Sequence, residues 1–278
     1  MIHRFLIDLL ARFPLLYSAL RGAYSYRELS HPAKPTSFGF KFSGPSSMER
    51  GEFEPDETRQ LRTLLESAEV FVNIGANVGY YVCHARQLGK QVVAIEPLEQ
   101  NVQKLQRNLL ANGWRDVEVV PVALGEGIGL EPLYGGGTGA SLLTGWAGSS
   151  PRHFRMVPVN TLDNLLGDRF SGRNLLFLID VEGFELKVLR GAVRQFSRRP
   201  APVWFIEICI NEHQPGTDRI NPNLMETFEI FWRHGYTAVK SGCESGPVSR
   251  DDVKQWMKGE NVPKTHNFVF KAADPSNV

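Results

Sequence analysis

The chain has 278 residues, 42% of them hydrophobic and 22% charged, which suits one globular domain of generous size with a substantial core. Its 31 Lys and Arg residues balance 30 Asp and Glu residues, so no strong electric field would draw it to nucleic acid. Three cysteines lie far apart without a CxxC pair. They predict neither a disulfide framework nor a zinc site and favour a reducing, cytoplasmic compartment.

Residues 1–22 carry apolar side chains at helical spacing, while Arg4, Asp8 and Arg12 lie on the opposite face. The stretch is too short and too charged to span a membrane. It predicts an amphipathic helix that packs on the protein or, alternatively, makes peripheral contact with a membrane surface. Residues 23–56 are rich in Pro, Ser, Gly and aromatic residues without periodicity, which indicates a covering segment. We therefore expect an N-terminal part, residues 1–56, and a main domain, residues 57–278.

Strands and helices alternate through the first half of the main domain. Short apolar runs that end at glycine or polar residues predict buried strands, and apolar residues three and four apart predict helices. The expected elements are a helix at Glu57–Ser67, a strand at Val70–Ile74, a helix at Val78–Leu88, a strand at Gln91–Ile95, a helix at Pro97–Leu110 and a strand at Val117–Val122.

The alternation pauses at residues 126–148, whose many glycines indicate a mobile loop or an irregular hairpin. It then resumes, and the whole pattern predicts an α/β fold with a mostly parallel sheet and helices on both faces. The later elements are a strand at Arg155–Val159, a short helix from Thr161, a strand at Leu175–Ile179, a helix at Phe184–Phe196, a strand at Val203–Ile210, a helix at Leu224–His234, and last strands at Tyr236–Val239 and Asn267–Lys271.

The turn after the first strand contains Gly75, Ala76, Asn77 and Gly79 and leads directly into a helix. Glycine lets backbone approach a ligand closely, and a helix N-terminus offers free N–H groups. Asn77 suits a left-handed conformation or a helix cap. A tight connection without any ligand is the alternative interpretation of the same residues.

Glu96 ends the next strand, 17 residues after Gly79. An acidic residue at this place can accept hydrogen bonds from ribose hydroxyls, although a carboxylate is also favourable at a helix N-terminus without any ligand. The Gly75-x-x-x-Gly79 spacing, with Asn77 where dinucleotide sites have a middle glycine, suits pyrophosphate poorly. It favours a smaller sulfonium nucleoside that carries an amino-acid tail.

Five blocks in order resemble an FkbM-type methyltransferase: Asn-Ile-Gly-Ala-Asn-Val-Gly-Tyr-Tyr, Ala-Ile-Glu-Pro, Val-Ala-Leu-Gly, Thr-Leu-Asp and Ile-Asp-Val-Glu-Gly-Phe-Glu-Leu-Lys-Val-Leu-Arg-Gly-Ala. The resemblance covers about residues 71–239, and its last block, residues 179–192, is the most specific. It implies a Rossmann-like class I methyltransferase fold with a seven-stranded sheet, and S-adenosylmethionine as cofactor. It also implies methylation, most often, of a hydroxyl oxygen on a sugar, polyketide or similar metabolite.

The resemblance also implies roles for individual residues. Gly75, Asn77 and Gly79 would form the cofactor turn, Glu96 would bind the ribose, and Ala123 would lie near the adenine. One position departs from the family: Asn73 stands where an acidic residue usually orders the amino-acid end of the cofactor. An amide still offers a donor and an acceptor, but the change is expected to weaken binding or to shift the contact to water.

Asp180 and Glu182 follow a buried strand at the sheet edge where α/β proteins place ligands. Either carboxylate is a candidate to contact cofactor or substrate, to accept the proton of an acceptor hydroxyl, or to help hold a divalent metal. Capping of the following helix is the alternative. Glu185 is expected to face solvent or to pair with Lys187 or Arg190.

Glu207 lies within a strand expected to be buried, so its charge needs a partner or a purpose. His213 follows in the next loop and is a third candidate base, although surface histidines are common. Glu207, His213 and Asp180 are metal-ligand types, but their spacing matches no compact metal motif. In the glycine-rich loop, Trp146 is a candidate to stack on a sugar, unless that loop is simply disordered surface.

The sequence thus predicts methyl transfer from S-adenosylmethionine to a small-molecule or glycan acceptor, with Glu182, His213 and Asp180 as catalytic candidates. Two alternatives remain: an oxidoreductase that uses a nicotinamide dinucleotide such as NAD, and a nucleotide-binding protein with little or no catalysis, suggested by Asn73.

Overall fold

The computed structural model describes residues 31–216, 219–242 and 245–273. The helix expected over residues 1–22, with its proposed membrane contact, lies outside these ranges. Within them, none of the helices combines the length and the apolar character needed to cross a membrane.

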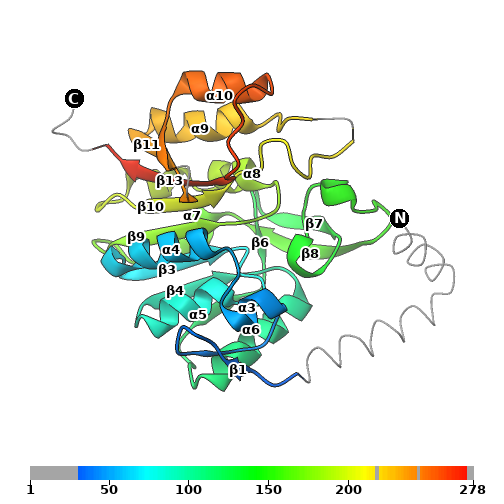
Figure 1. Ribbon diagram of the computed structural model, residues 1–278, viewed down its shortest axis with the longest axis vertical. Helices are drawn as coiled ribbons and strands as arrows, with labels where there is room; N and C mark the ends of the chain where they lie inside the picture. The colour runs from blue at the N-terminus through cyan, green and yellow to red at the C-terminus, as the bar shows by residue number, and fades with distance from the viewer. Residues whose placement is uncertain (1–30, 217–218, 243–244, 274–278) are drawn as a thin grey trace.

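An eight-stranded sheet forms the centre of the described chain, in the order β12-β11-β13-β10-β9-β3-β4-β5 (Figure 1). The strands from β10 to β5 run parallel, whereas the pairings of β10 with β13, of β13 with β11 and of β11 with β12 are antiparallel. In chain order the strands are β3 (Val70–Ile74), β4 (Gln91–Ile95), β5 (Glu118–Val120), β9 (Leu175–Ile179), β10 (Val203–Glu207), β11 (Tyr236–Lys240), β12 (Gly246–Val248) and β13 (Asn267–Ala272).

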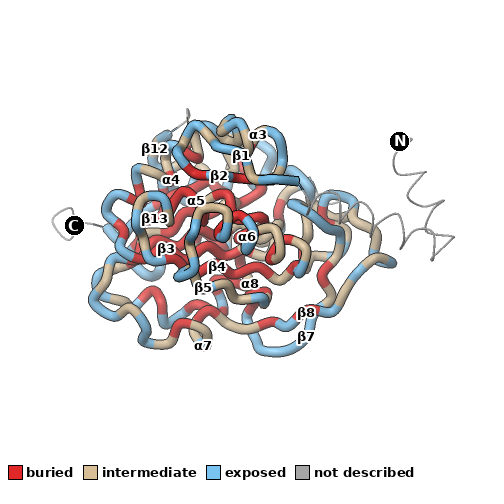
Figure 2. The backbone as a smooth tube through the Cα atoms, turned by 90° about the horizontal axis from the view of Figure 1, so that it is seen from below, coloured by how far each residue is buried: buried red, intermediate tan, exposed pale blue. Residues whose placement is uncertain are grey.

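Helices cover both faces of this sheet, which is why every residue of β3 and β9 is buried. Phe71 and Leu178 pack toward α4 (Pro55–Ser67), α5 (Tyr80–Gln87) and α6 (Glu99–Ala111). Val72 and Ile179 pack toward the opposite layer. That layer contains α7 (Leu162–Leu166), α8 (Glu185–Arg190), α9 (Leu224–Arg233) and α10 (Arg250–Met257). Figure 2 shows the buried backbone concentrated in β3 and β4 between these layers.

A smaller three-stranded sheet lies beside the carboxyl ends of the central strands (Figure 1). It contains β6 (Ala123–Leu124), β7 (Gly129–Tyr134) and β8 (Phe154–Asn160). The glycine-rich stretch after β7 is an irregular hairpin, as one of the two interpretations of the sequence proposed. It contains two 3-10 turns, Gly137–Gly139 and Trp146–Gly148, and a bridge between Tyr134 and Ser141.

The Rossmann-like α/β fold is confirmed, and three details differ from the sequence prediction. The main sheet has an eighth strand because β12 adds to its edge. The helix expected at Phe184–Phe196 breaks at Gly191, where a Cβ atom would lie 2.0 Å from the Gly125 carbonyl oxygen, and a 3-10 turn follows at Val193–Ser197. Helix α10 was not predicted; its Ser249–Asp252 capping box is the pattern that marks its start.

The covering segment, where described, contains β1 (Lys34–Pro35), β2 (Lys41–Phe42) and α3 (Ser46–Arg50). Asn108 of α6 and Asn112, which follows the end of α6, bind the backbone of this segment. The Asn108 amide accepts from Ser43 N and donates to Ser43 O and to Val78 O, at 2.8, 3.0 and 2.9 Å. The Asn112 amide accepts from Lys41 N and donates to Lys41 O, both at 2.7 Å. The segment is therefore hydrogen-bonded to the same helix that supports the turn after β3.

Replacing Asn108 with Ala is expected to lower the free energy of unfolding by about 2–4 kcal/mol, because it leaves buried backbone groups without partners. Asn112→Ala, at a more exposed position, is the matched control and should cost about 1 kcal/mol. Urea denaturation of the two variants measures both values. Equal losses would contradict the assigned role of Asn108.

Candidate functional site

The carboxyl ends of β3, β4 and β9 meet at one edge of the sheet, beside the smaller sheet, and line a pocket that is partly open to solvent. Edges of this kind are where open α/β sheets bind ligands. Six of the residues singled out from the sequence line the pocket: Gly75, Asn77, Glu96, Ala123, Asp180 and Glu182.

The turn after β3 crosses the end of β9 at very short range. Gly75 has a φ of +83°, and a Cβ atom on it would lie 1.7 Å from the carbonyl oxygen of Asp180. Its N–H and that of Ala76 both donate to the Ile95 carbonyl oxygen of β4, at 2.9 Å each. Gly75 is thus required for contact between strands, in addition to any approach to a ligand.

Asn77 adopts the left-handed conformation that the sequence suggested, with a φ of +50°, and its side-chain oxygen accepts from Val78 N at 2.8 Å. Gly79, with a φ of +87°, lies against α6, where a Cβ atom would be 2.9 Å from Leu105 Cγ. The two residues shape the turn in different ways: Asn77 lines the pocket, whereas Gly79 packs behind it.

Glu96 connects the turn to the start of α6. One carboxylate oxygen accepts from Asn77 N at 2.8 Å, and the other accepts from Leu98 N at 2.9 Å and from the Asn101 amide at 3.2 Å. Burial raises the pKa of Glu96, and these donors lower it. Because each carboxylate oxygen has two lone pairs, the oxygen that faces Asn77 can still accept a further hydrogen bond.

The chemistry of the pocket fits a cationic nucleoside better than a dinucleotide. Its described lining residues include three carboxylates, Glu96, Asp180 and Glu182, and no Lys or Arg to neutralise a pyrophosphate. Apolar residues from the smaller sheet, among them Ala123 and Leu133, form the remaining wall, as an aromatic base requires.

Four other predicted residues are absent from the described lining. Asn73 is buried within β3, on the same strand face as Phe71. Ala76 and Gly79 are buried inside the turn. His213 is exposed in the loop after β10, with a φ of +60°. The structure therefore brings Asp180 and Glu182 together at the pocket and leaves His213 outside it.

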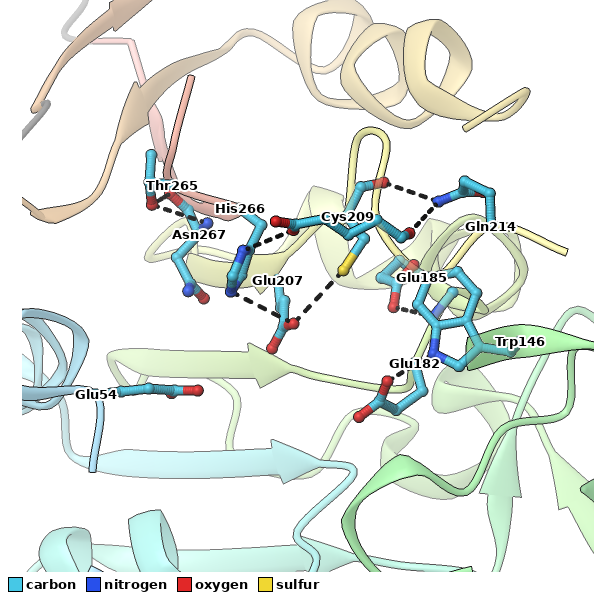
Figure 3. A network of polar contacts seen from close by, with 12 residues as sticks. Glu54, Trp146, Glu182, Glu185, Glu207, Cys209, Gln214, Thr265, His266 and Asn267 are labelled. Atoms are coloured by element: carbon cyan, nitrogen blue, oxygen red, sulfur yellow. Dashed lines mark hydrogen bonds and ion pairs between the residues drawn. The ribbon is translucent and has the colours of Figure 1, made fainter. Parts of the chain in front are cut away.

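Glu182 is held by the glycine-rich loop (Figure 3). The Trp146 indole N–H donates to its carboxylate at 2.6 Å, and the Ser141 hydroxyl donates to its carbonyl oxygen at 2.6 Å. Trp146 is 1% exposed, so the idea that it stacks on a sugar is wrong. Burial raises the pKa of Glu182, while the bond from Trp146 lowers it.

Glu185 contradicts its predicted exposed position. It is 4% exposed, and its carboxylate accepts from Gly183 N at 2.9 Å. Lys187 and Arg190 instead pair with Glu126. Burial raises the pKa of Glu185 to about 7. The prediction failed because the turn before α8 directs the Glu185 side chain back toward Gly183 N–H, into the protein.

Glu207 is half-buried at the end of β10 rather than fully buried, and its carboxylate does have partners. Its carboxylate lies 3.7 Å from His266 Nε2 and accepts from the Cys209 thiol at 3.7 Å. Burial, with Glu54 as the leading neighbouring charge, raises the pKa of Glu207 to about 8. In Figure 3 the carboxylates of Glu54, Glu182 and Glu207 point toward the same space. Glu54 and His266 were not predicted, because they come from distant segments and belong to no motif.

Glu54 is carried into this group by the end of the covering segment. Its backbone is left-handed, with a φ of +40°, and its carboxylate accepts from the Tyr81 hydroxyl at 2.6 Å. Asp180 lies nearby, and burial followed by Glu207 and Glu182 raises its pKa well above the ordinary value. Across residues 31–216, 219–242 and 245–273, no three side chains of metal-binding type are placed to hold an ion together.

Comparisons with known proteins give a family and a set of distant folds. The sequence model described as "Methyltransferase FkbM domain" matches residues 73–238, more than half of the chain. No curated protein matches the sequence.

Among solved structures, the chain is similar to an O-methyltransferase from Bacillus cereus in complex with SAH, at 15% identity over 78% of this chain and 80% of that chain, with a TM-score of 0.45. It is also similar to a precorrin-6y C5,15-methyltransferase from Geobacter metallireducens, at 12% identity over 78% and 86%, with a TM-score of 0.41. A ribosomal protein L11 methylase from Lactobacillus delbrueckii gives 11% over 78% and 79%, with a TM-score of 0.40.

The close approach of Gly75 to β9 can be tested by substitution. Gly75→Ala should lower the free energy of unfolding by about 3 kcal/mol or more, because it adds a steric clash to the cost of a left-handed alanine. Gly89→Ala is the matched control: Gly89 is also left-handed, with a φ of +73°, but nothing lies within 4 Å of its added Cβ. That variant should lose about 1 kcal/mol. If urea denaturation shows that the two variants lose similar amounts of unfolding free energy, the clash at Gly75 is refuted.

Glu185 predicts how stability depends on pH. A carboxyl whose pKa rises from 4.5 to about 7 on folding stabilises the folded state below the unfolded value, and this contribution is lost as pH rises through 7. Glu185→Gln keeps an acceptor for Gly183 N–H without the charge. It should raise the free energy of unfolding by about 1–3 kcal/mol near pH 8.5, and little near pH 5.

Denaturation curves at the two pH values test this, with the exposed Glu66→Gln as a control that should show no such difference. A change for Glu185→Gln that is the same at both pH values would contradict the buried, proton-binding state of Glu185.

Proposed function

Because the chain belongs to the FkbM methyltransferase family, we propose that it methylates a hydroxyl oxygen on a sugar, polyketide or related metabolite. Its methyl donor is S-adenosylmethionine. The observation that carries the proposal is the carboxylate-lined pocket at the ends of β3, β4 and β9, where the Trp146 indole N–H holds the carboxylate of Glu182. A hydroxyl acceptor is the kind that needs such a group, because its proton must leave as the oxygen is methylated.

We place the cofactor against the predicted residues as follows. The turn formed by Gly75, Ala76, Asn77 and Gly79 would receive its amino-acid end. Glu96 would accept hydrogen bonds from the ribose, and Ala123 would lie against the adenine. Asp180 would face the cationic part of the molecule. Asn73 would act from within β3, through the shape and polarity of the turn that follows it.

When bound, S-adenosylmethionine supplies a methyl group activated by the attached positive sulfur, which keeps the bonding electron pair as the new carbon–oxygen bond forms. The protein has two tasks. It holds the acceptor oxygen in line with the methyl carbon at near-attack distance, and it takes up the hydroxyl proton. A small or glycan acceptor would enter from the side of Glu54, Glu182 and Glu207.

Among the three candidate bases, position and charge favour Glu182. Burial raises the pKa of Glu182, and the bond from Trp146 lowers it and so supports the ionised form that a base needs. Asp180 is surrounded by further carboxylates that raise its pKa more strongly, which disfavours its ionised form and suits a positioning role. His213 would need to approach from outside the described pocket lining.

Titration calorimetry with S-adenosylhomocysteine, S-adenosylmethionine and NAD tests the binding half of the proposal. We expect the two sulfur compounds to bind and NAD to show no heat, because no Lys or Arg of the described lining meets a pyrophosphate. Preferential binding of NAD would favour an oxidoreductase instead.

Methyl transfer from labelled S-adenosylmethionine to a panel of sugars, sugar nucleotides and polyketide alcohols tests the catalytic half. Glu182→Gln should reduce transfer by about 10²–10⁴-fold while S-adenosylhomocysteine affinity stays close to that of the unaltered protein. Asp180→Asn and His213→Gln distinguish the other candidates. Binding without transfer to any acceptor of the panel would support a nucleotide-binding protein with little catalysis.

A further inference from the structure

One loop fixes both the backbone and the side chain of Glu182. The Trp146 indole N–H bonds its carboxylate at 2.6 Å, and the Ser141 hydroxyl bonds its carbonyl oxygen at 2.6 Å. The same hydroxyl accepts from Leu143 N at 2.9 Å, so the loop is closed on itself where it meets Glu182. These bonds join segments 36 and 41 residues apart in sequence.

The indole ring is seated against the turn that presents Glu182. A Cβ atom on Gly183 would lie 2.5 Å from Trp146 Cζ3, so the indole ring packs directly against the Gly183 backbone. Glu182 has a φ of +56° and Gly183 a φ of +93°, a sharp turn that directs the carboxylate to the pocket. A left-handed glutamate is costly and persists where surrounding contacts determine it.

Trp146 is fully buried and is not one of the described residues that line the pocket. Its indole N–H instead meets the pocket lining through the Glu182 carboxylate. The loop also holds the segment of His213, because Ala147 N donates to the His213 carbonyl oxygen at 2.9 Å.

We propose that Trp146 is a positioning residue, whose indole N–H fixes the carboxylate of Glu182 toward the reacting end of the pocket. The inference rests on the proposed function, because it assigns Trp146 a role toward the base of that reaction. A charge-assisted bond to a buried carboxylate both restricts its rotamer and favours its ionised form.

The carboxylate of Glu182 titrates among other charged groups, and these set the background for any pH measurement. They lie on the turn before α8 and at its first residue, at the end of β10, in the loops after β10 and before β13, and at the end of the covering segment: Asp180, Glu185, Glu207, His213, His266 and Glu54. The indole N–H is a fixed donor that does not titrate, so its removal changes Glu182 without changing the number of these charges.

The test compares two ligands of the full-length protein by calorimetry between about pH 5 and pH 9. One is neutral at the reacting position, S-adenosylhomocysteine. The other is sinefungin, which carries an ammonium group there. The ratio of their dissociation constants reports the ionisation of carboxylates near that position and requires no known acceptor. In the unaltered protein the preference for sinefungin should grow as the pH rises and Glu182 ionises.

Trp146→Phe keeps a ring against Gly183 and removes the N–H. We expect S-adenosylhomocysteine affinity within about twofold of the unaltered protein, and a rise of about one unit in the midpoint pH of the sinefungin preference. Glu182→Gln should remove this pH-dependent component. Trp204→Phe is the matched control, because Trp204 is also buried and stacks on Phe177 and Phe196, with ring centroids 4.2 and 4.9 Å away. Its replacement should leave the midpoint pH of the sinefungin preference unchanged.

The inference is overturned if the titration of Trp146→Phe superimposes on that of the unaltered protein while Glu182→Gln abolishes the pH dependence. Trp146 would then only pack against its neighbours. An unchanged titration in Glu182→Gln would overturn it too, since the fixed carboxylate would then not face the ligand. A protein that binds neither compound would instead remove the proposed function itself.

Discussion

The contact between the end of β3 and the end of β9 is the constraint on which the rest of the site depends. Gly75 passes so close to the Asp180 carbonyl that a single added carbon would overlap it. This approach brings the turn, Glu96 and the Asp180–Glu182 segment to one pocket. Any side chain at Gly75 would separate the two strand ends and with them the groups that have to act on one ligand. Packing and function therefore require the same glycine.

Electrostatics explain why the pocket suits one class of ligand. Four carboxylates collect at the sheet edge from three segments that lie apart in the sequence, and burial raises the pKa of each: Glu54, Asp180, Glu182 and Glu207. Such a group is unfavourable without compensation, because every neighbour opposes ionisation of the next. A bound cation relieves that repulsion, which makes binding of a positively charged cofactor favourable at a site that repels phosphates. Of these four, Glu182 lines the pocket and also accepts from the Trp146 indole N–H, which favours its ionised form.

The sequence predicts the framework well and the contacts between distant segments poorly. Strands Val70–Ile74, Gln91–Ile95 and Leu175–Ile179 agree with prediction at both ends, because continuous apolar runs flanked by polar residues have few other ways to fold. The predicted exposed position of Glu185 was wrong because the direction of its side chain is set by the hydrogen bond to Gly183 N, two residues earlier, and not by helix periodicity. Glu54 and the seat of Trp146 on Gly183 could not be predicted, since each depends on chain segments that meet only in the folded protein.

The most direct test of the central claim is a crystal structure of the protein with S-adenosylhomocysteine. We expect the ribose hydroxyls on the Glu96 carboxylate, the adenine against Ala123, and the sulfur on the side of Asp180 and Glu182. A nucleoside bound elsewhere would contradict it. So would a nucleoside in this pocket with Glu96 still bonded only to Asn77, Leu98 and Asn101.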